Sequence, residues 1–228
     1  MGTNLEAVYI VYTADGACAA FEDATNKFEP GSVRVQSGAH CYEDVCRLHT
    51  APPYLPHTPF LGMNTLCSVQ VHPSLYCTLS TILYFIQFVF DEKTKAVLQM
   101  SQLLDWGVDP ERGYYLSSGD TNWGAFKKLF AKGKVLPGGS CYSVGLGGHI
   151  SGGGDGILSR LNGITVDWLT GVEVVVKDKD ESGVTNAARL IYVSKDSTDK
   201  EEHDLWWAHT GGGGGNFGVI TKCDLPPL

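Results

Sequence analysis

One stretch of the chain, residues 138–156, constrains the fold more than any other part of the sequence, because nine of its nineteen residues are glycine. Glycine loses more conformational freedom on folding than any other residue, so a flexible linker is the first interpretation to weigh. A backbone without Cβ atoms can also lie flush against a flat or anionic ligand and turn its N–H groups toward it. Linkers are monotonous in Gly and Ser, whereas this stretch carries spaced larger side chains, which favours a ligand-binding loop. These side chains are Cys141, Val144, Leu146, His149 and Ile150.

The composition fits a globular protein and argues against several classes of partner. The chain has 228 residues, of which 43% are hydrophobic and 18% charged, which is enough for a sizeable core. Its formal net charge of −8 argues against nucleic acid or an anionic membrane as the main partner. Seven irregularly spaced cysteines, without a Cys-x-x-Cys pair, predict neither a disulfide framework nor a structural zinc site. No metal site is therefore expected.

The tract of residues 48–90 contains no Asp, Glu, Lys or Arg. It shows neither helical nor strand periodicity. Its last part, residues 79–90, is apolar but shorter than the roughly 18–20 residues that a membrane helix needs, and polar residues interrupt it. A membrane span is not expected. The N-terminus has no basic segment before an apolar one, so no signal peptide is recognised and the compartment is left open.

Hydrophobic periodicity predicts several strands and helices along the chain. The strands are identified by β-branched or aromatic runs, and the helices by apolar residues three or four positions apart. The first strand, helix and second strand are typical of a βαβ unit, and the charged turn at 177–183 predicts a hairpin. Strands are expected at residues 7–12, 32–37, 96–100, 114–118, 172–176, 189–193 and 219–222, and helices at residues 13–27, 119–132 and 202–210.

Common nucleotide and nucleophile motifs do not fit their required context. Gly213-x-Gly215-x-x-Gly218 matches the dinucleotide fingerprint as a string, but a strand is expected after it where a helix should begin. The chain contains no Gly-x-x-x-x-Gly-Lys-Ser/Thr phosphate loop and no Gly-x-Ser-x-Gly nucleophile elbow. None of these three motifs explains the glycine-rich stretches.

Three blocks of the sequence resemble one family, the FAD-linked oxidases of the vanillyl-alcohol-oxidase superfamily, in their berberine-bridge-enzyme-like branch. Residues 34–44, Arg-Val-Gln-Ser-Gly-Ala-His-Cys-Tyr-Glu-Asp, are similar to the family loop Arg-x-x-Ser-Gly-Gly-His-Ser/Cys-Tyr. Residues 138–160 and 204–219 are similar to two further blocks of the same proteins. The blocks are collinear, and the resemblance covers residues 5–44 and 88–222.

The resemblance implies FAD as the cofactor, attached through two covalent bonds. His40 stands at the position that bonds the flavin 8α-methyl group, and Cys141 at the position that bonds flavin C6. Taken alone, His40 could also be a core histidine and Cys141 a small buried hydrophobe, although packed N–H dipoles would favour the thiolate that attack requires. The other cofactor-binding positions that the blocks imply are Ser37, Gly38, Ala39, Cys41, Gly138, Gly139, Ser140, Val144, Gly145, Gly147, Gly148, His149, Gly152, Gly154, Gly156, Leu158, Gly215, Asn216, Gly218 and Val219.

Two residues depart from the family pattern. Ala39 stands where relatives usually have Gly, which adds a methyl group beside the pyrophosphate. Asp155 stands where relatives have the Tyr of Gly-Gly-Gly-Tyr-Gly, a tyrosine proposed in some members to take part in acid–base chemistry. Asp155 is thus the candidate catalytic residue, either as a base with a raised pKa or as a solvated loop residue without that role. His149 and the pair Trp206–Trp207 are interpreted as residues that pack and order the backbone.

The fold that the resemblance implies is α+β: a two-lobed PCMH-type FAD-binding domain, incomplete at its C-terminus. Residues 1–105 would form one lobe, residues 106–228 a second lobe with an antiparallel sheet, and FAD would lie between them. The implied reaction oxidises an alcohol or sugar-type C–H donor, with hydride transfer to the flavin and O2 as acceptor, giving H2O2. The implied partners are a small-molecule substrate and O2. The alternative is a non-catalytic flavin-binding fragment or a gene-model product without turnover.

Residues 45–87, inside the uncharged tract, are interpreted as a non-native insert from a retained intron. Joining Asp44 directly to Phe88 restores the spacing of relatives, and a pyrimidine-rich tract read in frame encodes mainly Pro, Leu, Ser and Phe. The alternative is a real surface loop, although structureless loops of this length are uncommon in compact domains. The cysteines and histidines of the tract are for this reason not interpreted as a metal site.

Overall fold

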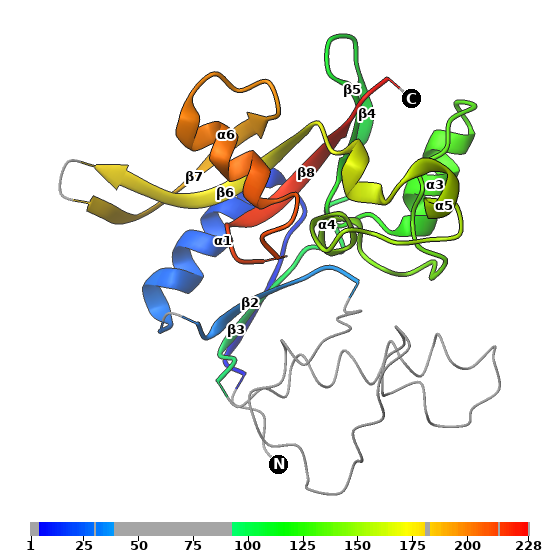
Figure 1. The fold of residues 1–228 in the computed structure, drawn as a ribbon. Coiled ribbons are helices and arrows are strands. Elements are labelled where there is room, and N and C mark those ends of the chain that lie inside the picture. Colours follow the sequence, from blue (N-terminus) through cyan, green and yellow to red (C-terminus); the bar gives the residue numbers. More distant parts are fainter. Residues whose placement is uncertain (1–4, 30, 39–92, 181–182, 214, 228) are drawn as a thin grey trace, which may run out of the picture.

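Two β-sheets form the framework of the protein (Figure 1). The computed structural model describes residues 5–29, 31–38, 93–180, 183–213 and 215–227. Residues 39–92, which include His40 and the proposed insert at 45–87, lie outside the described residues. One sheet is parallel and the other antiparallel, and helices pack on both, so the expected α+β class is confirmed. None of the described helices is long and apolar enough to span a bilayer.

The first sheet is parallel and its central strand comes last in the sequence. Its spatial order is β1 (Ala7–Ile10), β3 (Ala96–Gln99), β2 (Val33–Gln36). The expected strand–helix–strand opening is present, but β1 and β2 do not pair with each other, because β3 lies between them and pairs with both. Residues 96–98 are at most 2% exposed, as expected for a strand covered on both faces.

The second sheet is antiparallel, in the order β4-β5-β8-β6-β7. The predicted hairpin is confirmed as β6 and β7, and the last predicted strand, β8, is the central one, buried at every position except Lys222. β4 was not expected, because its four residues contain a glycine and are too few to show periodicity. The strands are β4 (Trp106–Asp109), β5 (Gly113–Ser117), β6 (Gly171–Asp180), β7 (Gly183–Ser194) and β8 (Val219–Leu225).

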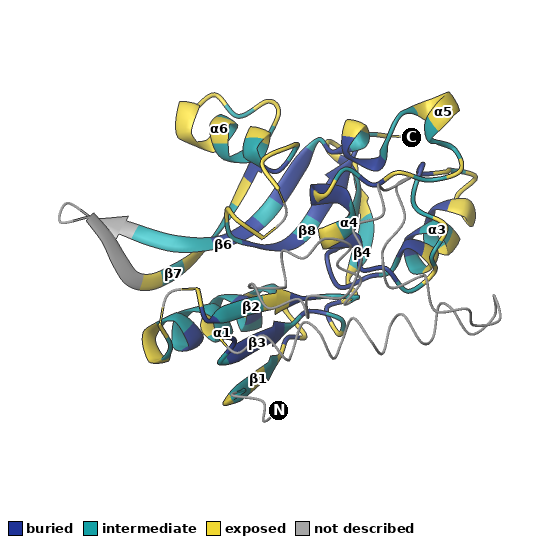
Figure 2. Ribbon diagram, turned by 60° about the horizontal axis from the view of Figure 1, so that its bottom comes forward, coloured by how far each residue is buried: buried dark blue, intermediate teal, exposed yellow. Residues whose placement is uncertain are grey.

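Helix α1 (Ala14–Lys27) lies between the two sheets (Figure 2). Ala17 and Ala24 are fully buried, and a hydrophobic cluster that α1 shares with β3, β6 and β8 joins the sheets. The Glu22 carboxylate also accepts the backbone N–H of Ala188, in β7, at 2.8 Å. Helix α1 therefore sets how the parallel sheet sits against the antiparallel one.

The remaining helices pack around the second sheet. The two helices expected after residue 100 are present, each with a capping side chain: Thr121 accepts from Gly124 N at 3.0 Å, and Asp199 from Glu201 N at 2.9 Å. Three short helices inside or just after the glycine-rich stretch were not expected, because glycine lowers helix propensity. The helices are α3 (Asn122–Phe130), α4 (Leu146–Ser151), α5 (Ser159–Asn162), the 3₁₀ helix η3 (Thr165–Trp168) and α6 (Lys200–Ala208).

Candidate functional site

Two glycine-bearing segments that are distant in the sequence meet in the folded chain. We call residues 37–44 the first loop, of which Ser37 and Gly38 are described, and residues 138–156 the second loop. A Cβ atom on Gly38 would overlap the backbone of residues 143–145, and one on Gly145 would overlap Ser37 and Gly38. Any side chain at either glycine would push the loops apart, so glycine is required at both.

The segment between β5 and α3 holds both loops. The Ser118 carbonyl accepts from Ser37 Oγ at 2.9 Å and from Gly147 N at 3.0 Å, and the Asp120 carbonyl accepts from Leu146 N at 2.7 Å. The first N–H groups of α4 are thus bonded to this segment, which explains how a glycine-rich helix forms there. From the sequence, residues 119–132 were expected only to form a helix. The available signal was the Ser-Ser-Gly-Asp-Thr run before it, which is rich in turn and cap residues.

His149 fixes the other end of the second loop. Its Nε2 accepts a hydrogen bond from Gly139 N at 2.9 Å, so the proton of the neutral ring lies on Nδ1. Burial lowers the pKa of His149 to about 4, and the nearby charge of Asp155 opposes that shift. A Cβ atom on Gly139 would lie 2.8 Å from His149 Cε1, so this close approach also requires glycine. Cys141, which is half-buried, follows two residues later on the segment that this hydrogen bond holds.

Two kinds of glycine stand out in the site, those whose Cβ position is closed by other atoms and those whose Cβ position is open. At Gly156 a Cβ atom would overlap the Gly138 carbonyl, so glycine there serves the packing of the second loop on itself. At Gly148 and Gly215 no heavy atom lies within 4 Å of the Cβ position. Only the open class leaves the backbone accessible to a flat ligand from the Cβ side. The closed positions, where a Cβ atom would come within 3.0 Å of another heavy atom, also include Gly38, Gly139, Gly145, Gly147, Gly154 and Gly218.

A third loop, residues 211–218, connects α6 to β8, and Figures 1 and 2 both place it beside α4. Asn216 Nδ2 donates to the carbonyls of Gly212 and Gly213 at 3.3 and 3.4 Å. Gly218 has φ +128°, and a Cβ atom there would lie 2.6 Å from Val174 Cγ2. The loop is therefore curled on itself and anchored to β6 at its end. The three loops converge on the same side of the molecule.

The predicted site residues are not all placed alike. Ala39, His40 and Cys41 lie outside the described residues. Asp155 is exposed on the turn after α4, and Ser140 and Gly152 are also exposed. Val144 and Leu158 are buried and half-buried, respectively. Val219 is 1% exposed and packs in the cluster that joins the sheets, so its side chain serves the core and only its backbone could meet a ligand.

Buried polar atoms without partners gather near the meeting point of the loops. Among the described residues, the side-chain oxygens of Gln36, Ser117 and Ser118 have no hydrogen-bond partner, and these residues are 4%, 1% and 3% exposed. Buried polar groups are nearly always hydrogen-bonded, so such a group calls for a missing partner. Unpaired hydroxyls and open glycine backbone together fit a long polar cofactor with a flat ring system.

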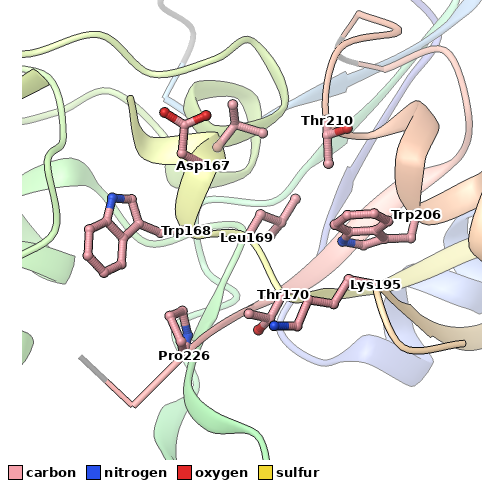
Figure 3. A pocket seen from close by; sticks show the side chains of 9 residues that line it. Asp167, Trp168, Leu169, Thr170, Lys195, Trp206, Thr210 and Pro226 are labelled. Atoms are coloured by element: carbon pink, nitrogen blue, oxygen red, sulfur yellow. The ribbon is translucent and has the colours of Figure 1, made fainter. Parts of the chain in front are cut away.

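A separate cavity of about 410 Å³ lies between η3, the C-terminal end of α6 and the end of β8 (Figure 3). Its walls include Trp168, Lys195, Trp206 and Thr170. Trp206 Nε1 and Thr170 Oγ1 are buried and have no hydrogen-bond partner in the part of the chain that the structure describes. None of the predicted cofactor-binding residues lines this cavity, so we do not assign it to the cofactor. The other half of the tryptophan pair, Trp207, is 66% exposed.

Comparisons with known proteins agree with this arrangement. The family model described as an FAD binding domain matches residues 87–180. The hexose oxidase of Chondrus crispus is 50% identical over 230 residues, a match that covers 99% of this chain and 33% of that protein. The aclacinomycin oxidase of Streptomyces galilaeus is 33% identical over 95% of this chain and 31% of its own length. The chain thus spans about a third of the curated relatives it matches.

Solved structures match along nearly the whole chain. Aclacinomycin oxidoreductase superposes with a TM-score of 0.68 at 32% identity, over 96% of this chain and 34% of that one. A glycopeptide hexose oxidase, solved with teicoplanin, gives a TM-score of 0.69 at 32% identity, over 97% and 35%. Berberine bridge enzyme, at 17% identity, shares the fold with a TM-score of 0.61. Along about a third of their length, the FAD-linked oxidases of the vanillyl-alcohol-oxidase superfamily are homologous to this chain, which shares their PCMH-type FAD-binding fold.

Proposed function

We propose that this chain is the FAD-binding part of an oxidase that acts on an alcohol or sugar-type donor. The observation that carries the proposal is the meeting of the first and second loops at Gly38 and Gly145, which brings the segment that leads into His40 to the loop that carries Cys141. The 50% identity to a hexose oxidase supports a sugar-type donor. Because the chain spans about a third of that relative, activity and substrate remain part of the proposal.

The residues of the site would divide the binding of FAD among them. The open backbone at Gly148 and Gly215 would lie against the cofactor, and the unpaired hydroxyls of Ser117 and Ser118 would donate to its polar chain. Following the family resemblance, one covalent bond would involve the 8α-methyl group and another flavin C6. The first would be formed by His40 and the second by Cys141.

When bound, FAD supplies a hydride acceptor at N5 that O2 returns to the oxidised state, with H2O2 as product. The contribution of this chain is to fix the cofactor and to keep the second loop rigid through the bond between His149 and Gly139. Asp155 is exposed to solvent, so the structure does not hold its carboxylate in the enclosed, oriented position that a catalytic base needs. We therefore assign proton removal to a group other than Asp155.

Purified protein supplied with FAD tests the proposal. Glucose, an oligosaccharide and a simple alcohol are offered in turn, and a peroxidase-coupled dye measures H2O2. We expect stoichiometric bound FAD, only weak peroxide production by this chain alone, and, in the oxidase of which it is the FAD-binding part, more peroxide from the sugars than from the alcohol. A chain that folds but takes up no FAD would contradict the cofactor assignment. Uptake of FAD with an alcohol preferred over every sugar would contradict the donor class.

A non-catalytic flavin-binding fragment is the second candidate. It is favoured because the exposed Asp155 stands at a position where the family has tyrosine. This candidate predicts bound FAD without peroxide from any donor. The same peroxide measurement therefore separates the two functions.

A further inference from the structure

The imidazole of His209 is buried at the end of α6 and has a defined orientation. The residue is 4% exposed, and its Nδ1 lies 2.8 Å from the Leu205 carbonyl oxygen. A carbonyl only accepts, so Nδ1 carries the proton and the ring is held by the last turn of the helix. Burial lowers the pKa of His209, which keeps the ring neutral.

The His209 ring contacts the third loop through one aromatic side chain. Its centroid lies 6.1 Å from that of Phe217, and the planes meet at 66°, an edge-to-face arrangement. The Phe217 ring occupies the space that a Cβ atom on Gly212 would need. Gly212 N donates to the Ala208 carbonyl at 2.8 Å, so the start of the loop is tied to the same helix.

The third loop needs such a support because of its composition. Gly213, Gly215 and Gly218 have φ values of +92°, +78° and +128°, a region that other residues rarely adopt. Glycine reaches these angles without strain but loses the most entropy when it is fixed. Within the loop, the side chain that bridges two carbonyls is Asn216, next to Phe217. The Phe217 ring, which lies beside Asn216 and is anchored by His209, therefore orders the backbone next to it.

We infer that His209 is a positioning residue that holds the third loop, through Phe217, in the conformation that receives the flavin. The inference deepens the proposed function and rests on it. His209 itself need not touch FAD. Its hydrogen bond to the Leu205 carbonyl fixes the orientation of the imidazole, and the imidazole fixes the position of the Phe217 ring. Phe217 and Asn216 together fix the backbone conformation around Gly215.

The test compares two histidines of the same helical segment. His209→Leu removes the hydrogen bond and the polar ring edge, while His203→Leu makes the same change at a half-buried histidine whose ring contacts Trp206 instead. FAD binding is measured by titration in a background with His40→Ala and Cys141→Ser, so that binding is reversible. We expect His209→Leu to weaken FAD about tenfold, as for the loss of one hydrogen bond and one aromatic contact, and His203→Leu to change it less than twofold. The visible circular dichroism of the bound flavin should change only in the His209 variant.

A double-mutant cycle separates positioning from general destabilisation. If Phe217→Leu weakens FAD to a similar degree and the double variant is no worse than either single one, the two side chains act as one unit. Additive losses, or equal effects of the two histidine changes, would overturn the inference. Hydrogen exchange of residues 210–218 gives an independent reading: faster exchange confined to His209→Leu and Phe217→Leu supports it, and unchanged exchange contradicts it. That reading holds even if the unmodified chain binds no FAD, an outcome that would instead contradict the proposed function.

Discussion

The Nε2 atom of His149 accepts the backbone N–H of Gly139 across 2.9 Å, and this bond joins the short helix α4 to the start of the loop that carries Cys141. The bond exists only while the imidazole is neutral, because a protonated ring has no acceptor. The integrity of the second loop is therefore tied to the protonation of one side chain.

Acid should lower the free energy of unfolding by protonating His149. The pKa of His149 is about 4 in the folded chain and near its ordinary 6.5 when unfolded, so between these values the unfolded chain binds more protons. The free energy of unfolding should be at its full value above about pH 6.5 and fall toward pH 4, by at most about 3 kcal/mol. His149→Gln keeps a neutral acceptor and should flatten this dependence, as measured by urea unfolding at several pH values. The same slope in His149→Gln as in the unmodified chain would contradict the assignment; His203→Gln is the control.

Flavin should survive unfolding of the protein. If His40 and Cys141 each bond FAD, denatured protein stays yellow, and peptide mapping places the mass of FAD on both residues. His40→Ala and Cys141→Ala should each retain the cofactor through the remaining bond, and the double variant should release it on denaturation. Complete loss of flavin from the denatured unmodified chain would show that neither bond forms.

Removal of residues 45–87 should leave a folded chain. β2 and β3 are neighbouring parallel strands in register from Val33↔Ala96 to Gln36↔Gln99. Without the tract, sixteen residues (37–44 and 88–95) remain for the return path. A parallel crossover takes about a dozen residues or more, and the path along β3 is only about 13 Å, so the shorter link suffices.

Thermal unfolding and FAD uptake of the shortened chain provide the measurement, with an unchanged midpoint expected. Deleting residues 41–92 is the matched control, because the seven residues that remain are too few for a crossover and that chain should not fold. The match of the family model from residue 87 onward supports the proposal. Mature transcripts should lack the codons for residues 45–87. If most transcripts retain them, the proposed intron origin is wrong.

Replacement by valine should change the free energy of unfolding in opposite directions at two threonines, Thr170 and Thr165. Thr170 Oγ1 is buried without a partner in the wall of the cavity, whereas Thr165 Oγ1 lies 2.6 Å from the Pro137 carbonyl and 2.7 Å from that of Gly154. Thr170→Val removes an unpaired hydroxyl and should stabilise by about 1 kcal/mol; Thr165→Val leaves carbonyls unpaired and should destabilise by about 1–2 kcal/mol. Urea unfolding measures both. Equal losses would indicate that Thr170 has a partner in solution.

Asp155 should matter little for turnover. Its exposure leaves it solvated, so Asp155→Asn should lower the rate by less than about tenfold in a form of the protein that turns over. Asp155→Tyr, which restores the family residue, should not lower it. Peroxide release at saturating sugar is the measurement, with flavin content as the control. A loss of about a hundredfold at unchanged flavin content would identify the carboxylate as the base.

Elements with a strong local pattern could be predicted from the sequence, and those held by distant partners could not. The runs at 172–176 and 189–193 carry their β pattern in their own residues and form β6 and β7 as expected. Helix α4 reads Leu-Gly-Gly-His-Ile-Ser, which no propensity scale favours, and it forms because the carbonyls of Ser118 and Asp120 bind its first N–H groups. The place of β3 between β1 and β2 depends on pairing across the sheet, which periodicity does not encode.

The same limit applies to the site. The family blocks identified which loops carry the predicted site residues, but not why each glycine is there. The contact of Gly38 with Gly145 joins residues more than a hundred positions apart and makes these glycines necessary for loop packing, while their predicted place in the cofactor site stays a prediction. The side chain of Val219 packs in the core, as a β-branched residue at the start of a central strand does, and the predicted contact of this residue with the cofactor stays a prediction.

The position of β3 also dictates when the first sheet can assemble on the ribosome. β1 and β2 have no strand to pair with until residues 96–99 emerge, and at roughly 5–20 residues per second the wait after β2 lasts about 3–13 seconds. During this interval Val8 and Ile10, which stay more than half exposed in the folded chain, belong to an unpaired apolar edge. A message without the codons for residues 45–87 would shorten the wait by about two thirds, so nascent chains with the tract spend longer as substrates for chaperones and for aggregation.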